Sequence, residues 1–514
     1  MSDGADARES LEEIAPSEAD GTADPWRRLD ARMLLVHPLE TLVRFLPALL
    51  AVLLFRSGSD DNDRWELYAV PVIVAYGVLR WLTTRYRIAD GQVELRRGVL
   101  TRQTTTARLD RVRTVDLTAR PYHQLLGLAK VEISTAGGGR ERLVLDSLSA
   151  EHGRRLRAEL LHRVDAPAAD APVEASAPVG DELLVRLDPA WLRYAPLTLT
   201  GLASAAAIVG FASQGFSRYA QERSVFRAGA GWVAGLVWWA DVLLLLGAVS
   251  ALAVAAYLLT FWGFRLTRNR LGTMHTRRGL LTRRETTIDA ARVRGIRIDE
   301  PLGLRLAGAR RLKVVTTGLL RERGGSDWLC PPAPADVVTS VALRIRPDRE
   351  AVEGALTAHG HAAARRRLTR TLVPATLASA GLVAARLLWD WHGSLLVVVP
   401  LLLIGAVALG RDRYRSLGHA VTADHLVTRH GSLDRQRVVL DRDGIIGWTV
   451  RRSFFQRRAG LATLVATTAA GEQHYDIVDV PVERAYAVLA QVSPALLAEA
   501  TPRYESSAPT KRGA

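Results

Sequence analysis

Long apolar stretches alternate with strongly polar segments along the whole chain. Six such stretches are nearly free of internal charge and come in pairs, at about Leu42–Phe55, Leu67–Leu82, Trp191–Phe211, Trp232–Trp262, Leu372–Trp389 and Ser394–Gly410. A helix needs about twenty mostly apolar residues to cross a bilayer, and the third, fourth and sixth stretches reach that length comfortably. Several tryptophans lie in or near the ends of the stretches, as is typical of membrane interfaces. The pattern predicts three transmembrane hairpins, with buried helices of a large soluble protein as the alternative.

The charges around these stretches predict the orientation of the chain. Arginines cluster outside each pair, as at Arg365–Arg367, whereas the short loop Arg56–Trp65 carries three aspartates. By the positive-inside rule, both termini and the long polar segments face the cytoplasm. The loop Gln214–Ala230, with three arginines and one glutamate, weakens this orientation without reversing it. The acidic stretch Met1–Asp24 lacks the features of a signal peptide and is expected to be a disordered tail.

A threefold repeat organises the polar segments that follow the hairpins. Taken from a glycine, the segments align without gaps, and a second glycine follows twenty-nine residues later in every copy. The first glycines are Gly98, Gly279 and Gly431, and the second are Gly127, Gly308 and Gly460. Each repeat therefore consists of one hairpin and one domain.

Within each copy, apolar and polar residues alternate with the period of a β-strand. Clear cases are Tyr86–Ile88, Val93–Leu95 and Val131–Ile133, which predict half-buried antiparallel strands. The first glycine of each copy sits where a hairpin turn would reverse the chain, a position that favours positive φ. A helix-like stretch closes each copy, at Ala150–Leu161, Ala335–Ile345 and Val482–Val492. The pattern predicts a strand-rich domain that ends in an amphipathic helix.

These features resemble the bacterial pleckstrin-homology-like (PH) domain family, and their order matches its polytopic YdbT-like members. The residues that carry the resemblance are Tyr86–Ile88, Arg97–Leu100, Arg111–Val112 and Leu126–Ala129 in copy one, Phe264–Leu266, Arg278–Leu281 and Arg292–Val293 in copy two, and Pro25–Leu29 before the first stretch. The resemblance implies a small barrel of two packed antiparallel sheets, plugged at one end by the helix, with no established catalytic chemistry. Copy three departs from the pattern, because Gly444 replaces the arginine and His419 replaces the aromatic residue.

We therefore predict a polytopic membrane protein with three repeats of a transmembrane helical hairpin, each followed by a PH-like antiparallel β-barrel capped by a C-terminal helix. The predicted order is a disordered tail (1–24), hairpin 1 (25–82), PH-like domain 1 (83–163), a linker (164–185), hairpin 2 (186–262), PH-like domain 2 (263–360), hairpin 3 (361–410), PH-like domain 3 (411–493) and a disordered tail (494–514).

The composition excludes some classes of site. Lys and Arg (68) exceed Asp and Glu (53), which gives a net charge of +15 in a chain of 514 residues that is 48% hydrophobic. Only three of these cations are lysines, so a coding bias towards arginine explains much of the excess, and attraction to a membrane surface explains it as well as nucleic-acid binding does. The single cysteine, Cys330, excludes a disulfide framework and a multi-cysteine metal site.

Few residues have the pattern of catalytic or metal-binding groups. Gly137–Gly139 lacks the lysine and hydroxyl residue of a phosphate loop and is expected to be a hairpin tip. His359 and His361 flank a glycine without a third metal ligand, and Cys330 has no obvious base nearby. Asp241, in the fourth stretch, is expected to be interfacial or paired with arginine rather than part of a proton relay. We expect no catalytic residue, no metal and no cofactor.

Arginines around the glycine turns are the best candidates for contacts with lipid or a partner. The predicted set is Arg96, Arg97, Arg102 and Arg111 in copy one and Arg277, Arg278, Arg283 and Arg292 in copy two. Eukaryotic PH domains bind phosphoinositide headgroups with basic residues around their first hairpin, and the guanidinium group suits phosphate geometry. Nonspecific attraction to an anionic cytoplasmic leaflet is the alternative.

Together these patterns favour a non-catalytic scaffold anchored in the membrane, whose three cytoplasmic PH-like domains bind proteins or the lipid surface. The expected partners are anionic membrane lipids and unidentified proteins, including other PH-like membrane proteins or further copies of the chain, but not nucleic acid. The resemblance alone suggests a role in envelope homeostasis. The alternative is a component of a small-molecule or peptide transporter or exporter, which six spans and tandem repeats permit.

Overall fold

The computed structural model describes residues 27–28, 32, 78–79, 82–89, 92–97, 103–108, 112–135, 142–149, 151, 182–198, 231–270, 272–317, 327–389 and 393–494. Nearly all of predicted hairpin 1, most of the third apolar stretch, all but one residue of the helix-like stretch Ala150–Leu161 and almost all of both predicted tails lie outside these residues. The elements form three units, numbered one to three after the copy of the repeat that each contains.

The units have the same order of strands, with a short helix between the fourth and fifth strands after the hairpin. Unit one contains β1 (Arg27–Arg28), β2 (Arg85–Ala89), β3 (Gln92–Arg97), β4 (Gln103–Arg108), β5 (Val112–Ala119), α3 (Pro121–Leu125), β6 (Leu128–Thr135) and β7 (Arg142–Ser149). Unit two contains β8 (Glu182–Arg186), η3 (Pro189–Leu197), α6 (Gly231–Phe261), β9 (Arg265–Arg268), β10 (Met274–Arg278), β11 (Arg283–Ile288), η5 (Ala290–Arg292), β12 (Val293–Pro301), α7 (Leu302–Leu306), β13 (Ala309–Thr316), β14 (Trp328–Pro334) and α8 (Ala335–Ile345). Unit three contains α9 (Arg349–Glu353), α10 (Gly360–Trp389), η7 (Gly393–Val397), α11 (Val398–Arg415), β15 (Gly418–Val421), β16 (His425–His430), β17 (Asp434–Asp441), η8 (Arg442–Gly444), β18 (Ile445–Arg451), α12 (Phe454–Arg458), β19 (Leu461–Thr468), β20 (His474–Pro481) and α13 (Val482–Val492).

The predicted glycine turns and closing helices are confirmed in units two and three. α8 and α13 occupy the predicted ranges and bury one face in the core. Gly279 and Gly431 form the β10–β11 and β16–β17 turns with φ of 103° and 101°. A Cβ atom at either position would overlap the carbonyl oxygen of Thr282 or Asp434, so only glycine fits. The second glycine of each copy also has a positive φ, at the turn after the short helix (Gly127, Gly308 and Gly460).

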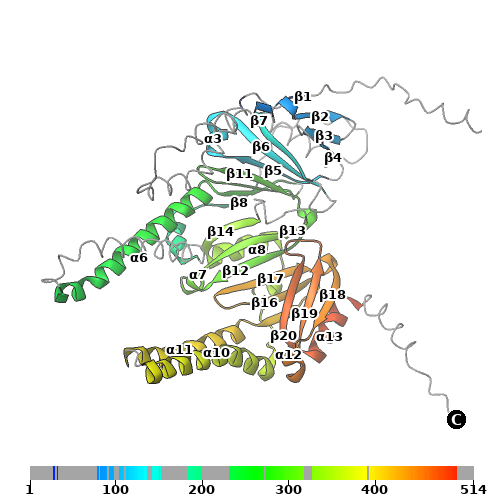
Figure 1. Cartoon of the computed structure of the whole chain (residues 1–514). Coiled ribbons are helices and arrows are strands. Elements are labelled where there is room, and N and C mark those ends of the chain that lie inside the picture. The colour runs from blue at the N-terminus through cyan, green and yellow to red at the C-terminus, as the bar shows by residue number, and fades with distance from the viewer. Residues whose placement is uncertain are drawn as a thin grey trace, which may run out of the picture.

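Continuous sheets join the three units (Figure 1). β5 of unit one pairs with β11 of unit two, and β12 of unit two pairs with β17 of unit three, both antiparallel. The joints produce a seven-stranded sheet, β7-β6-β5-β11-β10-β9-β8, and a six-stranded sheet, β14-β13-β12-β17-β16-β15. Val427 and Val439 of unit three belong to the buried core of unit two, and Val315 of unit two belongs to that of unit three. The units are therefore fused, which the sequence did not predict.

Each unit begins before its hairpin, which corrects the predicted domain boundaries. β1 pairs with β2 and β8 pairs with β9, and in unit three Thr357 forms a single bridge to His419. Residues 182–185, predicted as the end of the linker, are part of β8, where Leu184 and Val185 are buried. The segments predicted as hairpins thus lie between the first strand, or the Thr357 bridge, and the next strand of each unit, because the first strand forms an edge of the sheet completed after that segment.

The described part of the third apolar stretch is core rather than membrane helix. Residues 189–197 form η3, which Asp188 caps by accepting a hydrogen bond from the N–H of Ala190 (2.8 Å). Trp191 and Tyr194 are buried in the core of unit two. A membrane span therefore cannot begin at Trp191, since the first apolar residues of the stretch are used for packing in this core.

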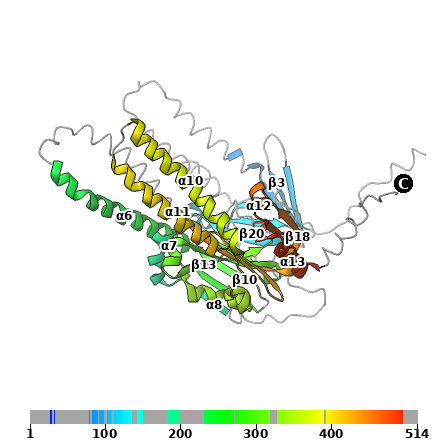
Figure 2. The ribbon, with the colours of Figure 1, turned by 90° about the horizontal axis from the view of Figure 1, so that it is seen from below.

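Long apolar helices leave the β-sheets on one side of the molecule (Figures 1 and 2). α10 and α11 pack as an antiparallel hairpin, and a Cβ on Gly410 would lie 2.6 Å from Thr371 Oγ1, which shows how closely the helices approach. Leu377, Leu387 and Leu401 on this hairpin are each more than 60% exposed. Within the described part of the chain, Gly360–Leu388 is the segment long and apolar enough to span a membrane, and Leu246–Phe261 of α6 is a shorter apolar helix. The full set of three hairpins remains a prediction.

Candidate functional site: joints and membrane-facing turns

The predicted arginines do not form one site. Arg277 and Arg283 are exposed on either side of the unit-two turn, and Arg277 Nε lies 3.5 Å from a carboxylate oxygen of Glu285. Arg292 follows the other end of β11, where its Nε lies 3.3 Å from an aspartate three residues earlier. Arg96 is exposed on β3. The side chains of Arg97, Arg102 and Arg111 lie outside the described residues.

Arg278 is buried beside the apolar helix α6. Its guanidinium carbon lies 5.5 Å from the ring centroid of Phe261, at the end of α6. Burial, together with repulsion from Arg284, lowers the pKa of Arg278 to about 10. The side chain therefore helps to fasten α6 to β10, and its position offers no support for a role in binding a ligand.

The turn of unit two lies against the end of α6. The N–H of Gly279 donates to the carbonyl of Trp262 (2.9 Å), and that of Leu280 donates to the carbonyl of Leu259 (3.1 Å). Leu280, Leu281 and Trp262 are 42%, 50% and 52% exposed. The tip of the turn and the end of the helix thus form one apolar surface flanked by exposed arginines, as an interface with lipid requires.

At both joints, the short helix of one unit contacts the glycine turn of the next. The side-chain amide of Gln124 in α3 donates to the carbonyl of Leu281 in the unit-two turn. The N–H of Leu302 at the start of α7 donates to the carbonyl of Leu433 in the unit-three turn (2.7 Å). The short helices therefore lie next to the glycine turns of the units that follow them.

The contact between α7 and the unit-three turn also includes the helical hairpin α10–α11. Arg305 of α7 donates to a carboxylate oxygen of Asp412 near the end of α11 (2.8 Å). The hydroxyl of Ser432 in the turn donates to the other oxygen of the same carboxylate (2.6 Å). Asp412 thus ties the helix, the turn and the preceding unit together.

Ion pairs reinforce the joint between units two and three. They are Arg346–Asp441 (2.6 Å), Arg297–Glu472 (2.7 Å), Arg311–Asp434 (3.3 Å) and Arg435–Glu300. The completely buried carboxylate of Asp299 accepts from Arg311 (3.1 Å) beneath them. Buried charges are costly to separate, so the joint is expected to stay closed.

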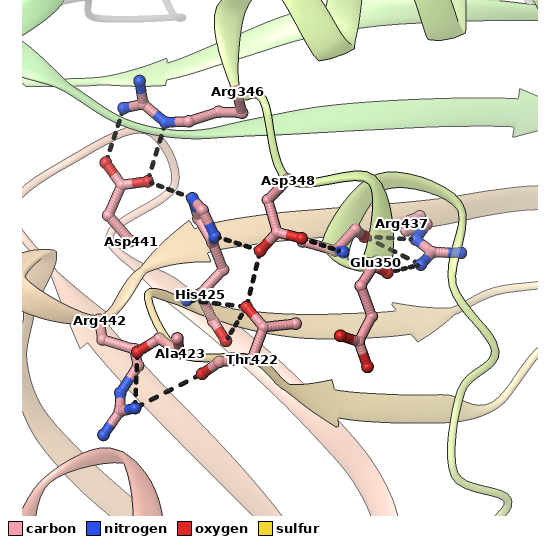
Figure 3. A network of polar contacts seen from close by, with 10 residues as sticks. Arg346, Asp348, Glu350, Thr422, Ala423, His425, Arg437, Asp441 and Arg442 are labelled. Atoms are coloured by element: carbon pink, nitrogen blue, oxygen red, sulfur yellow. Dashed lines mark hydrogen bonds and ion pairs between the residues drawn. The ribbon is translucent and has the colours of Figure 1, made fainter.

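An open cleft of about 640 Å³ lies over this joint and is lined by residues of both units. Figure 3 shows the polar network in its wall. His425 Nδ1 lies 2.8 Å from Asp348 Oδ2 and its Nε2 lies 3.5 Å from Asp441 Oδ1. Burial would raise the pKa of Asp348, but hydrogen bonds from Ala351, Thr422 and His425 outweigh it and hold that pKa below its usual value.

The groups of the network are bonded to one another rather than free to react, and the Arg346–Asp441 pair among them joins the two units. Arg346 donates to the carbonyl of Val293 (2.8 Å) as well as to Asp441, and Arg442 donates to the carbonyls of Ala423 (2.8 Å) and Val492 (3.2 Å). Since most of these donors and acceptors satisfy one another, the cleft has the character of a structural joint.

A histidine pair lies where hairpin 3 enters unit three. A carbonyl can only accept, so His359 Nδ1 donates to the carbonyl of Val478 (2.9 Å). The other ring nitrogen, His359 Nε2, therefore accepts from His419 Nδ1 (2.9 Å). Both ring nitrogens of His359 are used, and His361 is exposed, so the two histidines do not form a metal site. Burial lowers the pKa of both His359 and His419, the latter to about 4.

The other groups weighed for chemistry have ordinary positions. Cys330 is completely buried in β14, and burial raises the pKa of its thiol. Asp241 lies in α6, but its side chain is outside the described part of the chain. Among the residues that the structure describes, no three His, Cys, Asp or Glu side chains gather as metal ligands would.

Comparison with known proteins agrees with this repeated fold. A model of the bacterial PH domain matches residues 36–164, 204–357 and 372–496. This chain belongs to the bacterial PH domain family. Each matched region of this bacterial PH domain protein contains most of a predicted hairpin and starts after the strand or bridge that precedes that hairpin. The UPF0699 transmembrane protein YdbT of Bacillus subtilis (strain 168) is 21% identical over 421 residues, which cover 79% of this chain and 83% of that relative. No solved structure gives a significant match. The predicted family is confirmed.

Proposed function

We propose that the chain is a non-catalytic, membrane-anchored scaffold whose three PH units form one rigid β-array on the cytoplasmic face of the membrane. The observation that carries this proposal is the pair of continuous sheets at β5–β11 and β12–β17. The apolar helices that leave one side of the array, and a relative whose name describes a transmembrane protein, support the membrane attachment.

A rigid array presents its surfaces at fixed spacing and height above the lipid. Two weak contacts made by one rigid body reinforce each other through a high effective concentration, so no single strong site is needed. This arrangement suits binding of proteins or of the lipid surface, and a role in envelope homeostasis fits it.

The arrangement gives less support to a transporter or exporter component. Between Leu372 and Gly410, the described residues of hairpin 3 carry one ionisable side chain, Arg386. Ion and proton pathways through membranes usually need paired charges or broken helices at the middle of the bilayer.

The joint can be tested with two substitutions at the same position of the repeat. A Cβ on Gly295 would overlap the carbonyl oxygen of Val439 across the joint, whereas nothing lies within 4 Å of a Cβ on Gly447 in unit three. Gly295→Val is therefore expected to open the joint, and Gly447→Val should leave it closed.

Both variants would be compared with the natural sequence by in-cell crosslinking and mass spectrometry, at equal abundance in the membrane. We expect Gly295→Val to lose the crosslinked neighbours of the natural chain and Gly447→Val to keep them. If both variants keep the same neighbours, a rigid array is not what the protein uses to bind them.

A further inference from the structure

The short helix α12 of unit three differs from its equivalents because no other unit in the described part of the chain covers it. It lies within the sequence Arg-Arg-Ser-Phe-Phe-Gln-Arg-Arg, residues 451–458. Phe454 and Phe455 are 57% and 69% exposed, and their rings stack edge to face with centroids 5.5 Å apart. All four arginines are exposed, and none has an acidic partner within the described part of the chain. Two aromatic rings and four cations thus share one uncovered surface.

The repeat explains why this surface is uncovered. The position of Gln456 corresponds to Leu304 in α7, and both side chains are buried. The next position, Arg457, corresponds to Arg305, which binds Asp412 of the following unit (2.8 Å). The corresponding residue of α3, Gln124, also contacts the following unit. Arg457 therefore occupies the place where units one and two receive a neighbour.

α12 is fastened beside the start of a membrane helix. The Gln456 side-chain amide donates to Asp479 (2.8 Å), and the same carboxylate accepts from Arg366 near the start of α10 (2.9 Å). Ala459, directly after α12, packs in one apolar cluster with Ala363 of α10. Figures 1 and 2 both show α12 next to the start of α10. The polar first turns of α10 carry Arg365–Arg367 just before the apolar part of the hairpin, so α12 lies close to the level of the headgroups.

The arginines at the edge of β18 argue against a second copy of the chain as the partner that covers α12. Both joints use the same register, in which Arg283 pairs with Ala119 and Arg435 pairs with Glu300. A further copy added to β18 in that register would place its Arg102 against Arg452. Two arginines at the position that holds an Arg–Glu ion pair in the second joint would repel, as charges that protect free edge strands do.

We propose that residues 451–458 form a second membrane contact, in which Phe454 and Phe455 enter the interfacial region of the leaflet and the four arginines bind its anionic headgroups. Arginine suits phosphate geometry, and aromatic side chains prefer the interface between lipid and water. The short helix of unit three would then contact the membrane at the position where the short helices of units one and two contact the following unit. This inference rests on the membrane placement of hairpin 3, and the controls below separate the two.

The test uses the full chain with Cys330→Ser, reconstituted into phosphatidylcholine vesicles with and without phosphatidylglycerol. A nitroxide is attached at Phe455→Cys, and its collision rates with oxygen and with a neutral nickel complex report its depth. We expect the ratio of oxygen to nickel collisions to rise severalfold when phosphatidylglycerol is present. High salt, or Arg→Gln at positions 451, 452, 457 and 458, should return the label to water.

Two matched labels control the result. Leu377→Cys, on α10, must report lipid in both membranes, and Ala469→Cys, at the opposite end of β19 from α12, must report water. A label at 455 that stays in water in both membranes overturns the proposal while Leu377 still reports lipid. Shielding at 455 that is equal in both membranes, or spin–spin coupling between labels at 455, identifies a protein partner or a second copy instead. A Leu377 label in water would overturn the membrane placement itself.

Discussion

Asp479 is the residue whose charge should matter most for holding the β-strands of unit three on the helical hairpin α10–α11. It is completely buried at a β-bulge of β20, with φ of 55°. Its carboxylate accepts from Gln456 (2.8 Å) and Arg366 (2.9 Å) and lies 2.8 Å from Arg367. Asp479→Asn removes the charge but keeps the size, and asparagine tolerates positive φ as aspartate does. The change therefore tests the ion pairs without disturbing the backbone.

The expected cost follows from the burial of both partners. Breaking a buried ion pair usually costs about 3–5 kcal/mol, because one charge is left without compensation. The side chains of Arg366 and Arg367 are 13% and 15% exposed, so water can relieve part of this cost and we take about 3 kcal/mol. That free energy corresponds to roughly a hundredfold increase in the equilibrium constant for local opening of β20.

Hydrogen–deuterium exchange of the reconstituted chain measures this opening. We expect amides of β20 and of the first turns of α10 to exchange roughly a hundredfold faster in Asp479→Asn. The matched control is Asp443→Asn, because that carboxylate is 75% exposed and lies 3.5 Å from Arg294. An exposed pair contributes less than about 1 kcal/mol, so exchange should hardly change. Equal exchange in the two variants would show that the buried charge of Asp479 does not hold β20 and α10 together.

Two further predictions concern pH and backbone geometry. Burial and the neighbouring His359 lower the pKa of His419 to about 4, whereas an unfolded histidine titrates near 6.5. Between these values the unfolded chain binds more protons, so unit three should lose up to about 3 kcal/mol of stability as the pH falls from 6.5 to 4. Thermal unfolding at several pH values measures this loss of stability. If the stability of His419→Phe falls with pH as steeply as that of the natural chain, His419 is not the cause of the loss. Gly279→Ala should cost about 1–3 kcal/mol, because its φ of 103° suits only glycine, and Gly447→Ala should be milder in the same thermal assay. Equal losses of stability in Gly279→Ala and Gly447→Ala would contradict the requirement for glycine at the β10–β11 turn.

Local sequence patterns predicted the parts of the fold that depend on neighbours along the chain. The ranges of α8 and α13 and the turns at Gly279 and Gly431 follow from periodicity and from the steric demand for positive φ. The pairing of β8 with β9 was missed, because a five-residue strand gives a weak signal next to a Pro/Ala-rich segment and its partner lies beyond the hairpin. The joints were also missed, since pairing between distant strands depends on tertiary packing rather than on the local pattern.

The candidate site was predicted less well for the same reason. A glycine-turn pattern groups Arg277, Arg278 and Arg283 together, but strand alternation turns Arg278 inwards against Phe261 while the other two face solvent. The sequence spacing pointed to His359 and His361 as a pair, whereas the bridge between Thr357 and His419 brings His359 to His419. The aromatic and basic residues of α12 were readable in the sequence as residues 451–458, but only the folded structure shows that the described units leave them exposed.

Labelling of single cysteines reports on which side of the membrane the β-array lies, and the array is proposed to be cytoplasmic. In the Cys330→Ser background, Gly393→Cys places an exposed thiol at the far end of hairpin 3, and Ala469→Cys places one in unit three. An impermeant maleimide is applied to intact cells and then to opened cells. If the β-array is cytoplasmic, position 393 is labelled in intact cells and position 469 reacts only after the cells are opened. Labelling of position 469 in intact cells, with position 393 protected, would place the PH units outside the cytoplasm and overturn the proposed orientation.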